Sequence, residues 1–272
     1  MTVINTNVKS ILAQNALAVN NRSLTKAMEQ LSTGKRINNA SDDSAGLAIV
    51  SRMTAQIKAL DQSVRNANDA ISMMQTAEGA TKEITNMLER MRVLAVQSAN
   101  DTYSDTDRTA IGDEVEQLSA EITRISDNTQ WNGISVLKDG ATYSYQVGTE
   151  GDTASQITMK FEKMGANDLT VDALAVDTNA NSQLAIEAID TAITTVDTFR
   201  ATLGAKINRM TSAADNLANV SMNTSASRSR IEDADYAQAT TELARTQIVQ
   251  QAATAMLAQA NQQPQSVLTL LK

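Results

Sequence analysis

One stretch of the chain, residues 42–100, has room for a single uninterrupted helix. It contains no proline, and after Gly46 its only glycine is Gly79. Its apolar residues recur mostly at spacings of three and four, the repeat of a coiled-coil seam. At 1.5 Å per residue such a helix is roughly 90 Å long, so partner helices must run along its whole length. The predicted seam positions are Val50, Ile57, Leu60, Val64, Ala67, Ile71, Met74, Leu88, Met91 and Ala95, with Thr81 as a polar exception.

The composition suits narrow helix–helix seams better than a thick globular core. Of 272 residues, 42% are hydrophobic, but only 3% are aromatic and one is proline. The core must therefore be aliphatic and rich in alanine, and helix breaks should be few.

Several function classes are disfavoured by what the sequence lacks. Histidine and cysteine are both absent, which removes the commonest general base, thiol chemistry and the usual zinc ligands. We therefore expect no enzyme and no cofactor. The net charge of −8 argues against nucleic-acid and anionic-membrane partners. The acidic pair Asp42-Asp43 is better interpreted as a helix start than as a metal site, because carboxylates favour the N-terminal end of the helix dipole.

The N-terminal half predicts two helices beside the long one. Residues 1–33 are amphipathic and end at Gly34, which suits a helix C-terminus. A polar break over residues 35–44 follows. Beyond a second polar connection, Ser104 or Asp105 should cap a helix over residues 105–127, antiparallel to the long helix.

The character changes after residue 128. Asn132-Gly133 is a turn signal, and two alternating runs on either side of residues 148–152 predict a β-hairpin. One run places Tyr143, Tyr145 and Val147 on one face, and the other does the same with Ile157, Met159 and Phe161.

Helical periodicity returns after Asn179. A polar stretch over residues 219–229 predicts a break, and a last helix is expected to begin within residues 231–235 and to stop at Pro264. The fold class is thus mainly α: an elongated rod of long antiparallel coiled-coil helices with a small β-hairpin region in mid-chain.

Several stretches resemble bacterial flagellins. They are Ile4-Asn5-Thr6-Asn7, LSTGKRINNASDDSAGLAI (residues 31–49), RMRVLAVQSAN (residues 90–100), NTQWNGISVL (residues 128–137) and ANQQPQSVLTLLK (residues 260–272). The resemblance covers about residues 1–138 and 182–272, with the motifs in the family's order.

The resemblance implies a filament subunit for motility. Its chain ends would pair in an inner domain, D0, and its long helices would form a second domain, D1. The short mid-chain implies a form without outer domains D2 and D3. The implied segments are 1–44 (N-terminal D0 helix), 45–138 (N-terminal part of D1), 139–181 (β-hairpin region of D1), 182–230 (C-terminal part of D1) and 231–272 (C-terminal D0 helix).

The resemblance also implies a route, a location and partners. Export runs through the flagellar type III system, which agrees with an N-terminus that lacks the continuous apolar core of a Sec signal. The protein would lie in the extracellular filament. Its partners would be copies of itself, an export chaperone, the hook–filament junction and cap proteins, and Toll-like receptor 5.

Two sets of site residues follow from the resemblance. Arg90, Leu94 and Glu114 would form the surface for receptor recognition and for axial assembly. The D0 seam between subunits would contain Val8, Leu12, Leu24, Leu31, Leu243, Ile248, Met256 and Leu270.

Three other functions compete with the flagellin hypothesis. A hook–filament junction protein shares the helical ends, and an intracellular coiled-coil scaffold shares the periodicity. The third, a metallopeptidase inserted in a flagellin, needs the two histidines of an HExxH motif, and this chain has none.

Overall fold

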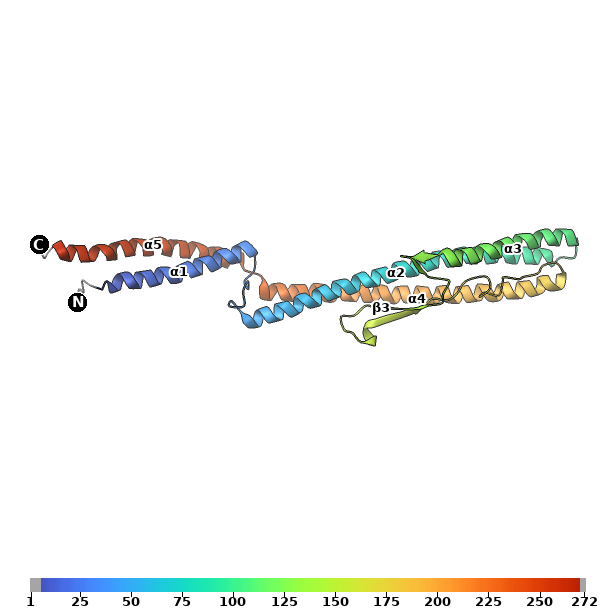
Figure 1. Cartoon of the computed structure of the whole chain (residues 1–272), viewed down its shortest axis with the longest axis horizontal. Coiled ribbons are helices and arrows are strands. Elements are labelled where there is room, and N and C mark those ends of the chain that lie inside the picture. Colours follow the sequence, from blue (N-terminus) through green and yellow to red (C-terminus); the bar gives the residue numbers. More distant parts are fainter. Residues whose placement is uncertain (1–5, 270–272) are drawn as a thin grey trace. The chain divides into compact units, whose positions relative to one another are not determined.

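The structure is a computed structural model that describes residues 6–269, and of residues 263–269 it describes only the backbone. Within this range the fold is mainly α, as predicted, with two small antiparallel hairpins (Figure 1). The helices are α1 (Val8–Thr33), α2 (Ser44–Ser98), α3 (Asp105–Asn128), α4 (Asn179–Glu232) and α5 (Tyr236–Thr269). The strands are β1 (Gln130–Trp131), β2 (Ile134–Ser135), β3 (Thr142–Gln146) and β4 (Gln156–Lys160), with a 3-10 turn at Thr153–Ser155 before β4.

The chain divides into two compact units. The terminal unit comprises Met1–Ile57 and Met222–Lys272, and the central unit comprises Lys58–Ser221. Each unit therefore contains segments from both halves of the sequence.

Helix α2 confirms the long helix predicted for residues 42–100. Its start is capped by Asp43, whose Oδ1 accepts a hydrogen bond from the N–H of Gly46 at 2.8 Å, so the helix-start interpretation is correct. A Cβ at Gly46 would lie 2.4 Å from Oδ2 of Asp43 and 2.7 Å from Cδ1 of Ile37, so a side chain there would displace the capping carboxylate. The Lys26 ammonium and the N–H groups of Asn39 and Asn38 hydrogen bond to Asp42 and lower its pKa.

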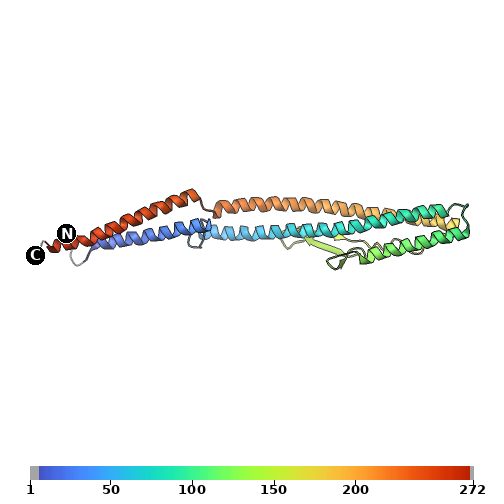
Figure 2. The same cartoon turned by 90° about the horizontal axis from the view of Figure 1, so that it is seen from above.

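Helices α2 and α4 run antiparallel through the central unit. Asp61 accepts a hydrogen bond from Ser221 at 2.8 Å, and further along α2 Arg92 bonds to Asp190 at 2.6 Å. Figure 2 shows the two helices side by side over this length. The core between α2, α3, α4 and the hairpins buries the predicted seam of α2 in this unit, including Ala67, Met74, Thr81, Leu88, Met91 and Ala95.

Helix α3 begins where the sequence predicted. The Ser104 hydroxyl accepts from the N–H of Asp107 at 3.3 Å, and the Asp107 carboxylate accepts from the N–H of Ser104 at 3.0 Å. This reciprocal pair is a capping box. The bonds from the Ser104 hydroxyl and N–H also lower the pKa of Asp107.

The predicted β-hairpin is formed by β3 and β4. Tyr143 pairs with Met159 and Tyr145 with Ile157, and this face packs against the core. The Tyr145 hydroxyl donates to the sulfur of Met73 on α2 at 3.1 Å, and burial raises its pKa to about 12. The smaller hairpin, β1–β2, turns at Asn132 and Gly133, whose positive φ values of 50° and 77° suit these residues.

The predicted break at residues 219–229 is wrong, because α4 continues through them to Glu232. The segment is polar but contains neither glycine nor proline, so nothing in it interrupts helical hydrogen bonding. The break lies instead at residues 233–235, which were expected to start a helix. There Asp235 caps α5 by accepting from the N–H of Ala237 at 2.9 Å.

The predicted stop at Pro264 is also wrong, because α5 runs on to Thr269. Proline has no backbone N–H, so it leaves the carbonyl four residues earlier without its helical donor. That carbonyl belongs to Ala260, and the side-chain amide of Asn7 donates to it at 2.8 Å. A donor from the other end of the chain thus replaces the missing bond.

The two helix breaks of the terminal unit are bonded to each other. Lys35 and Asp233 form an antiparallel bridge. The backbone N–H of Arg36 donates to the carbonyl of Glu232 at 2.6 Å. The guanidinium of Arg36 donates to the carbonyl of Ile231 at 2.7 Å. Arg36 therefore supplies donors to carbonyls that the end of α4 leaves without helical partners.

A buried arginine closes the turn between α2 and α3. The Arg108 side chain is 7% exposed, and its guanidinium donates to the carbonyls of Ser98 and Asn100 at the end of α2. It also pairs with Asp101 at 3.5 Å. A cation at this position both satisfies free carbonyls and complements the negative end of the helix dipole.

Replacing Arg108 with methionine should therefore destabilise the central unit. The substitution removes the donor to the Ser98 carbonyl and one of the two donors to the Asn100 carbonyl, which keeps its bond from the N–H of Tyr103 at 3.3 Å. We expect the free energy of unfolding to fall by about 1–3 kcal/mol. Urea unfolding of the monomer followed by circular dichroism measures this loss. The matched control is Arg124→Met on the same helix, which removes only an exposed pair with Glu121 and should cost less than about 0.5 kcal/mol. Equal losses would contradict the assignment.

Candidate functional site

Helices α1 and α5 pair antiparallel in the terminal unit, and polar bonds mark the register. Besides the bond from Asn7 to Ala260, the amide of Asn20 donates to the carbonyl of Thr246 at 2.8 Å. The hydroxyl of Ser10 lies 3.0 Å from Oδ1 of Asn261. The residues buried in this pair are small: Ser10, Ala27, Ala239 and Thr246.

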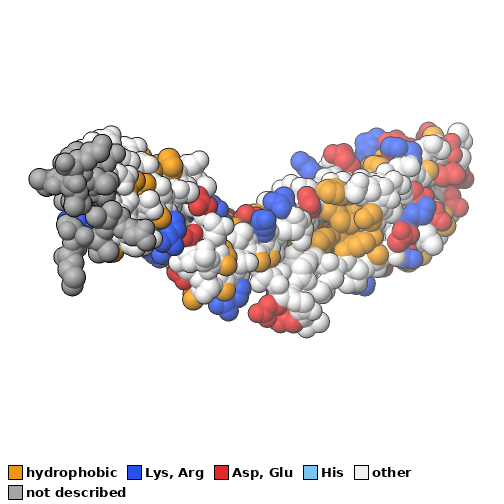
Figure 3. Space-filling view, turned by 60° about the vertical axis from the view of Figure 1, so that its left-hand side comes forward, with side chains coloured by type: hydrophobic (Ala, Val, Ile, Leu, Met, Phe, Trp, Pro, Cys, Tyr) orange, Lys and Arg blue, Asp and Glu red, His pale blue; other side chains and the backbone are white. Residues whose placement is uncertain are grey.

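Several larger apolar residues of α1 and α5 remain exposed beside this intramolecular seam. Among the residues predicted to join subunits, Val8, Leu12, Ile248 and Met256 are 63%, 70%, 66% and 66% exposed. Leu24, Leu31 and Leu243 are half-buried, and Leu270 lies outside the described residues. Figure 3 shows hydrophobic side chains, in orange, at the surface of the terminal unit.

A mainly apolar groove runs between the two helices. Its volume is about 520 Å³. Leu12 and Ala16 line it from α1, and Ala253 and Met256 from α5. Because Leu12 and Met256 are exposed in the isolated chain, burying them against another molecule would be favourable.

The second predicted surface lies in the central unit. Arg90 on α2 pairs with Glu114 on α3, with Nε at 2.9 Å and Nη2 at 2.7 Å from Oε1. Both side chains are about half exposed. The structure therefore brings together two of the three residues that the sequence proposed for recognition.

Leu94, the third residue, is not on this surface. It is 2% exposed and belongs to the core, because three and four residues separate it from the buried Met91 and Ser98. The exposed apolar residues here are Val93 and Val96, at 57% and 50%. The run Val93-Leu94-Ala95-Val96 contained the signal, since four consecutive apolar residues cannot all face one side of a helix.

An exposed ion pair next to this surface joins α2 to α4. The Arg92 guanidinium hydrogen bonds to the Asp190 carboxylate, which lowers the pKa of Asp190 and raises that of Arg92. The described residues contain no group of three or more acidic side chains placed to hold a metal ion.

Two family models match most of the chain. The model described as "Bacterial flagellin N-terminal helical region" matches residues 4–142, and that of the "Bacterial flagellin C-terminal helical region" matches residues 186–271. The chain belongs to the bacterial flagellin family. Members of this family are structural subunits of the flagellar filament, and the chain is such a subunit.

Individual flagellins match over the whole chain. A flagellin of Halalkalibacterium halodurans is 45% identical over 271 residues, which cover 99% of this chain and 100% of the relative. A flagellin of Xenorhabdus nematophila is 42% identical, with 100% of this chain and 99% of the relative covered. The alignment with polar flagellin F of Vibrio parahaemolyticus spans 372 positions at 34% identity, so that relative carries insertions that this 272-residue chain lacks. The chain is a short flagellin without outer domains.

Solved structures give the same fold. The crystal structure of Bacillus cereus flagellin is 32% identical, with a TM-score of 0.50 over 56% of this chain and 88% of that one. A putative flagellar hook-associated protein of Vibrio parahaemolyticus has a TM-score of 0.61 over 71% of this chain and 100% of that one, at 14% identity. The latter likeness concerns the fold alone. Since flagellins match over the whole chain, the junction-protein alternative is not favoured.

The bond from Asn7 to the Ala260 carbonyl can be tested by a double-mutant cycle. Asn7→Asp keeps the cap on Ser10 (3.2 Å) but removes the amide donor, so the α1–α5 pair should lose about 1 kcal/mol of stability. Pro264→Ala restores the helical donor to Ala260, and in that background Asn7→Asp should cost measurably less. Thermal melting of the four proteins, followed by circular dichroism, gives the coupling. Additive losses would show that Asn7 does not compensate for the proline.

Proposed function

We propose that the terminal unit carries the main contacts through which this flagellin polymerises. The observation that carries the proposal is the outward direction of the apolar side chains on α1 and α5. The pair joins itself through small residues and polar bonds, which leaves Val8, Leu12, Ile248 and Met256 free for neighbouring subunits. Burial of apolar surface contributes about 25 cal/mol per Å², so long contacts of this kind favour assembly.

The domain assignment follows from the same argument. Residues 1–44 and 231–272 form the inner domain D0, with α1 and α5 as its helices. Residues 45–138 and 182–230 form D1, with the β-hairpin region at residues 139–181. Support comes from the polar breaks at residues 34–43 and 233–235, which end α1 and begin α5.

Membership of the family supports a cellular route and a set of partners. We infer export through the flagellar type III system and a place in the extracellular filament. An export chaperone would cover the apolar surface of the unassembled subunit. The hook–filament junction and cap proteins would contact the subunits at the ends of the polymer. The helices described here include none whose length and hydropathy would allow it to cross a bilayer.

Receptor recognition is proposed for the surface around Arg90 and Glu114. The pair is exposed and joins two helices, and Val93 and Val96 add exposed apolar area beside it on α2. Arginine with neighbouring apolar area is typical of residues that dominate binding energy in protein interfaces. Toll-like receptor 5 is the partner that the family implies. In the filament, the same surface would contact the next subunit along the axis.

Polar substitutions on the outward stripe should impair polymerisation but not folding. Leu12→Gln and Met256→Gln each remove apolar burial worth about 1.5–3 kcal/mol, so each should raise the critical concentration for seeded growth by about tenfold or more. Sedimentation of polymer from monomer gives that concentration. The circular dichroism spectrum of the monomer should not change, because both side chains are exposed.

Matched controls separate hydrophobicity from shape. Leu12→Met and Met256→Leu retain apolar side chains of similar volume and should polymerise nearly as the natural protein does. If the glutamine variants also polymerise normally, the outward stripe is not the assembly surface.

The receptor hypothesis needs depolymerised protein and a reporter cell line. The natural monomer should activate Toll-like receptor 5, and Arg90→Ala should weaken the response by about tenfold through loss of an interface arginine. The control is Arg124→Ala on α3. Arg124 is about as exposed as Arg90 and pairs with Glu121 of its own helix, so its replacement should leave the response unchanged. A silent natural monomer, or equal responses from the two variants, would refute the hypothesis.

A further inference from the structure

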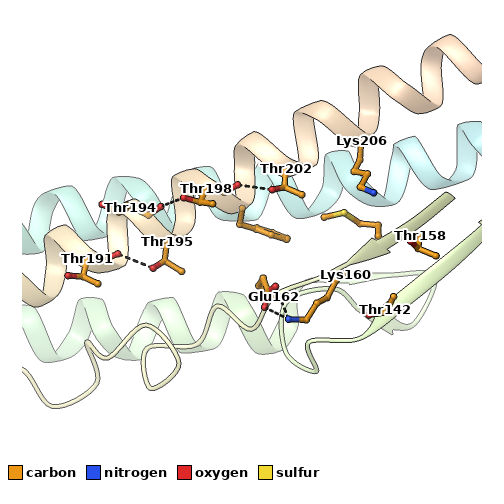
Figure 4. A pocket seen from close by; sticks show the side chains of 12 residues that line it. Thr142, Thr158, Lys160, Glu162, Thr191, Thr194, Thr195, Thr198, Thr202 and Lys206 are labelled. Atoms are coloured by element: carbon orange, nitrogen blue, oxygen red, sulfur yellow. Dashed lines mark hydrogen bonds and ion pairs between the residues drawn. The ribbon is translucent and has the colours of Figure 1, made fainter.

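Strand β4 borders a groove in the central unit, and none of the residues that line it belongs to the surfaces proposed above for assembly. The groove has a volume of about 690 Å³ and lies between the β3–β4 hairpin and one face of α4 (Figure 4). Thr158 and Lys160 line it from β4, and Thr198, Thr202 and Lys206 line it from α4. Met159 and Phe199, which are almost fully buried, contribute an apolar floor.

The register of the hairpin decides which backbone groups face the groove. The N–H of Phe161 donates to Ala141, and the N–H of Val147 donates to Ser155. In an antiparallel pair, hydrogen-bonded positions alternate with positions whose N–H and C=O point away from the partner. Thr158 and Lys160 fall on these outward positions of β4, so their backbone groups form an unpaired strand edge.

The two edges of the hairpin differ in what covers them. On β3, the outward carbonyl of Gln146 accepts from the amide of Asn66 on α2 at 3.1 Å. No comparable bond to the outward groups of Thr158 or Lys160 occurs among the described residues. The β4 edge is therefore open at Thr158 and Lys160, as β3 is at the opposite residues Ser144 and Thr142, but only the β4 positions line the groove together with α4 at both residues. Proteins usually protect such edges from pairing with other chains.

The threonine hydroxyls of the helical wall have no donor left for an occupant of the groove. The hydroxyls of Thr195, Thr198 and Thr202 each donate to the carbonyl four residues earlier, at 2.8–3.0 Å (Figure 4). The wall thus presents methyl groups and acceptor oxygens. An occupant that forms hydrogen bonds must satisfy its backbone mainly on β4, which selects an extended strand.

The charged residues of the groove indicate which side chains the bound strand would carry. Lys206 is half-buried in the groove, and it has no ion-pair or hydrogen-bond partner among the described residues. Lys160 adds a second ammonium, which Glu162 neutralises at 3.0 Å. In a chain with a net charge of −8, this groove retains an unpaired cation. We propose that the β4 edge binds an extended acidic peptide segment of another protein by strand addition, with a carboxylate of that segment on Lys206.

The test uses the full-length protein as a monomer and a short fluorescent peptide of alternating threonine and glutamate. Fluorescence polarisation should show saturable binding. Amide hydrogen exchange measured by NMR should slow by about tenfold at Thr158 and Lys160 when the peptide is bound. A peptide of alternating threonine and lysine serves as the control and should bind more weakly.

Two proline variants form a matched pair. Thr158 and Ser144 face each other in the hairpin, so Thr158→Pro and Ser144→Pro each remove one outward N–H at equivalent positions. Only Thr158→Pro should weaken binding, by about tenfold. Lys206→Gln should weaken binding by about threefold at low salt, and the difference should vanish at about 1 M salt, where the charge is screened.

Four results would overturn the proposal. They are the absence of binding, equal losses from the two proline variants, equal affinity for the acidic and basic peptides, and protection of Thr158 that rises with protein concentration when no peptide is present. The last result would assign the groove to a second copy of this chain. If Thr158→Pro fails to fold, Lys206→Gln still tests the proposal, because that substitution leaves the hairpin backbone intact.

Discussion

The central unit depends on the burial of one stripe of α2. Met74, Leu88, Met91 and Ala95 are fully buried along that stripe, and α3, α4 and the hairpins all pack against the same core. Helices in proteins acquire most of their stability from the packing of one face, and this holds for the 55 residues of α2. The other elements are therefore arranged as partners of α2, and the turns, caps and hairpin register serve to keep them there.

The terminal unit distributes its apolar residues in the opposite way. Polar bonds and small buried residues join α1 to α5, and several bulky apolar side chains, among them Leu12 and Met256, are exposed. The hydrophobic effect stabilises whatever removes such surface from water, and our proposal assigns that role to contacts between flagellin molecules. A single chain thus contains one unit that buries a continuous core and another that leaves large apolar side chains exposed.

Helix ends in this flagellin are satisfied by side chains that lie elsewhere in the sequence. Arg36 donates to the end of α4, Arg108 to the end of α2, and Asn7 to the carbonyl that Pro264 leaves free. Each of these groups donates a hydrogen bond to a carbonyl that lacks a helical donor. A carbonyl without any donor is costly when it is buried. The breaks and the proline are consequently tolerated because the antiparallel arrangement brings donors to them.

The sequence by itself determined the elements that depend on local pattern: the long α2, the start of α3 at Ser104 or Asp105, the end of α1 at Gly34 and the hairpin of β3 and β4. Periodicity, turn residues and caps act over a few residues, so they can be recognised without the fold. Only the tertiary structure decided the course of α4 through residues 219–229, the passage of α5 through Pro264, the burial of Leu94 and the exposure of Val93. These depend on which face of a helix meets a partner and on donors such as Asn7 that lie more than 250 residues away, and no local pattern contains that information.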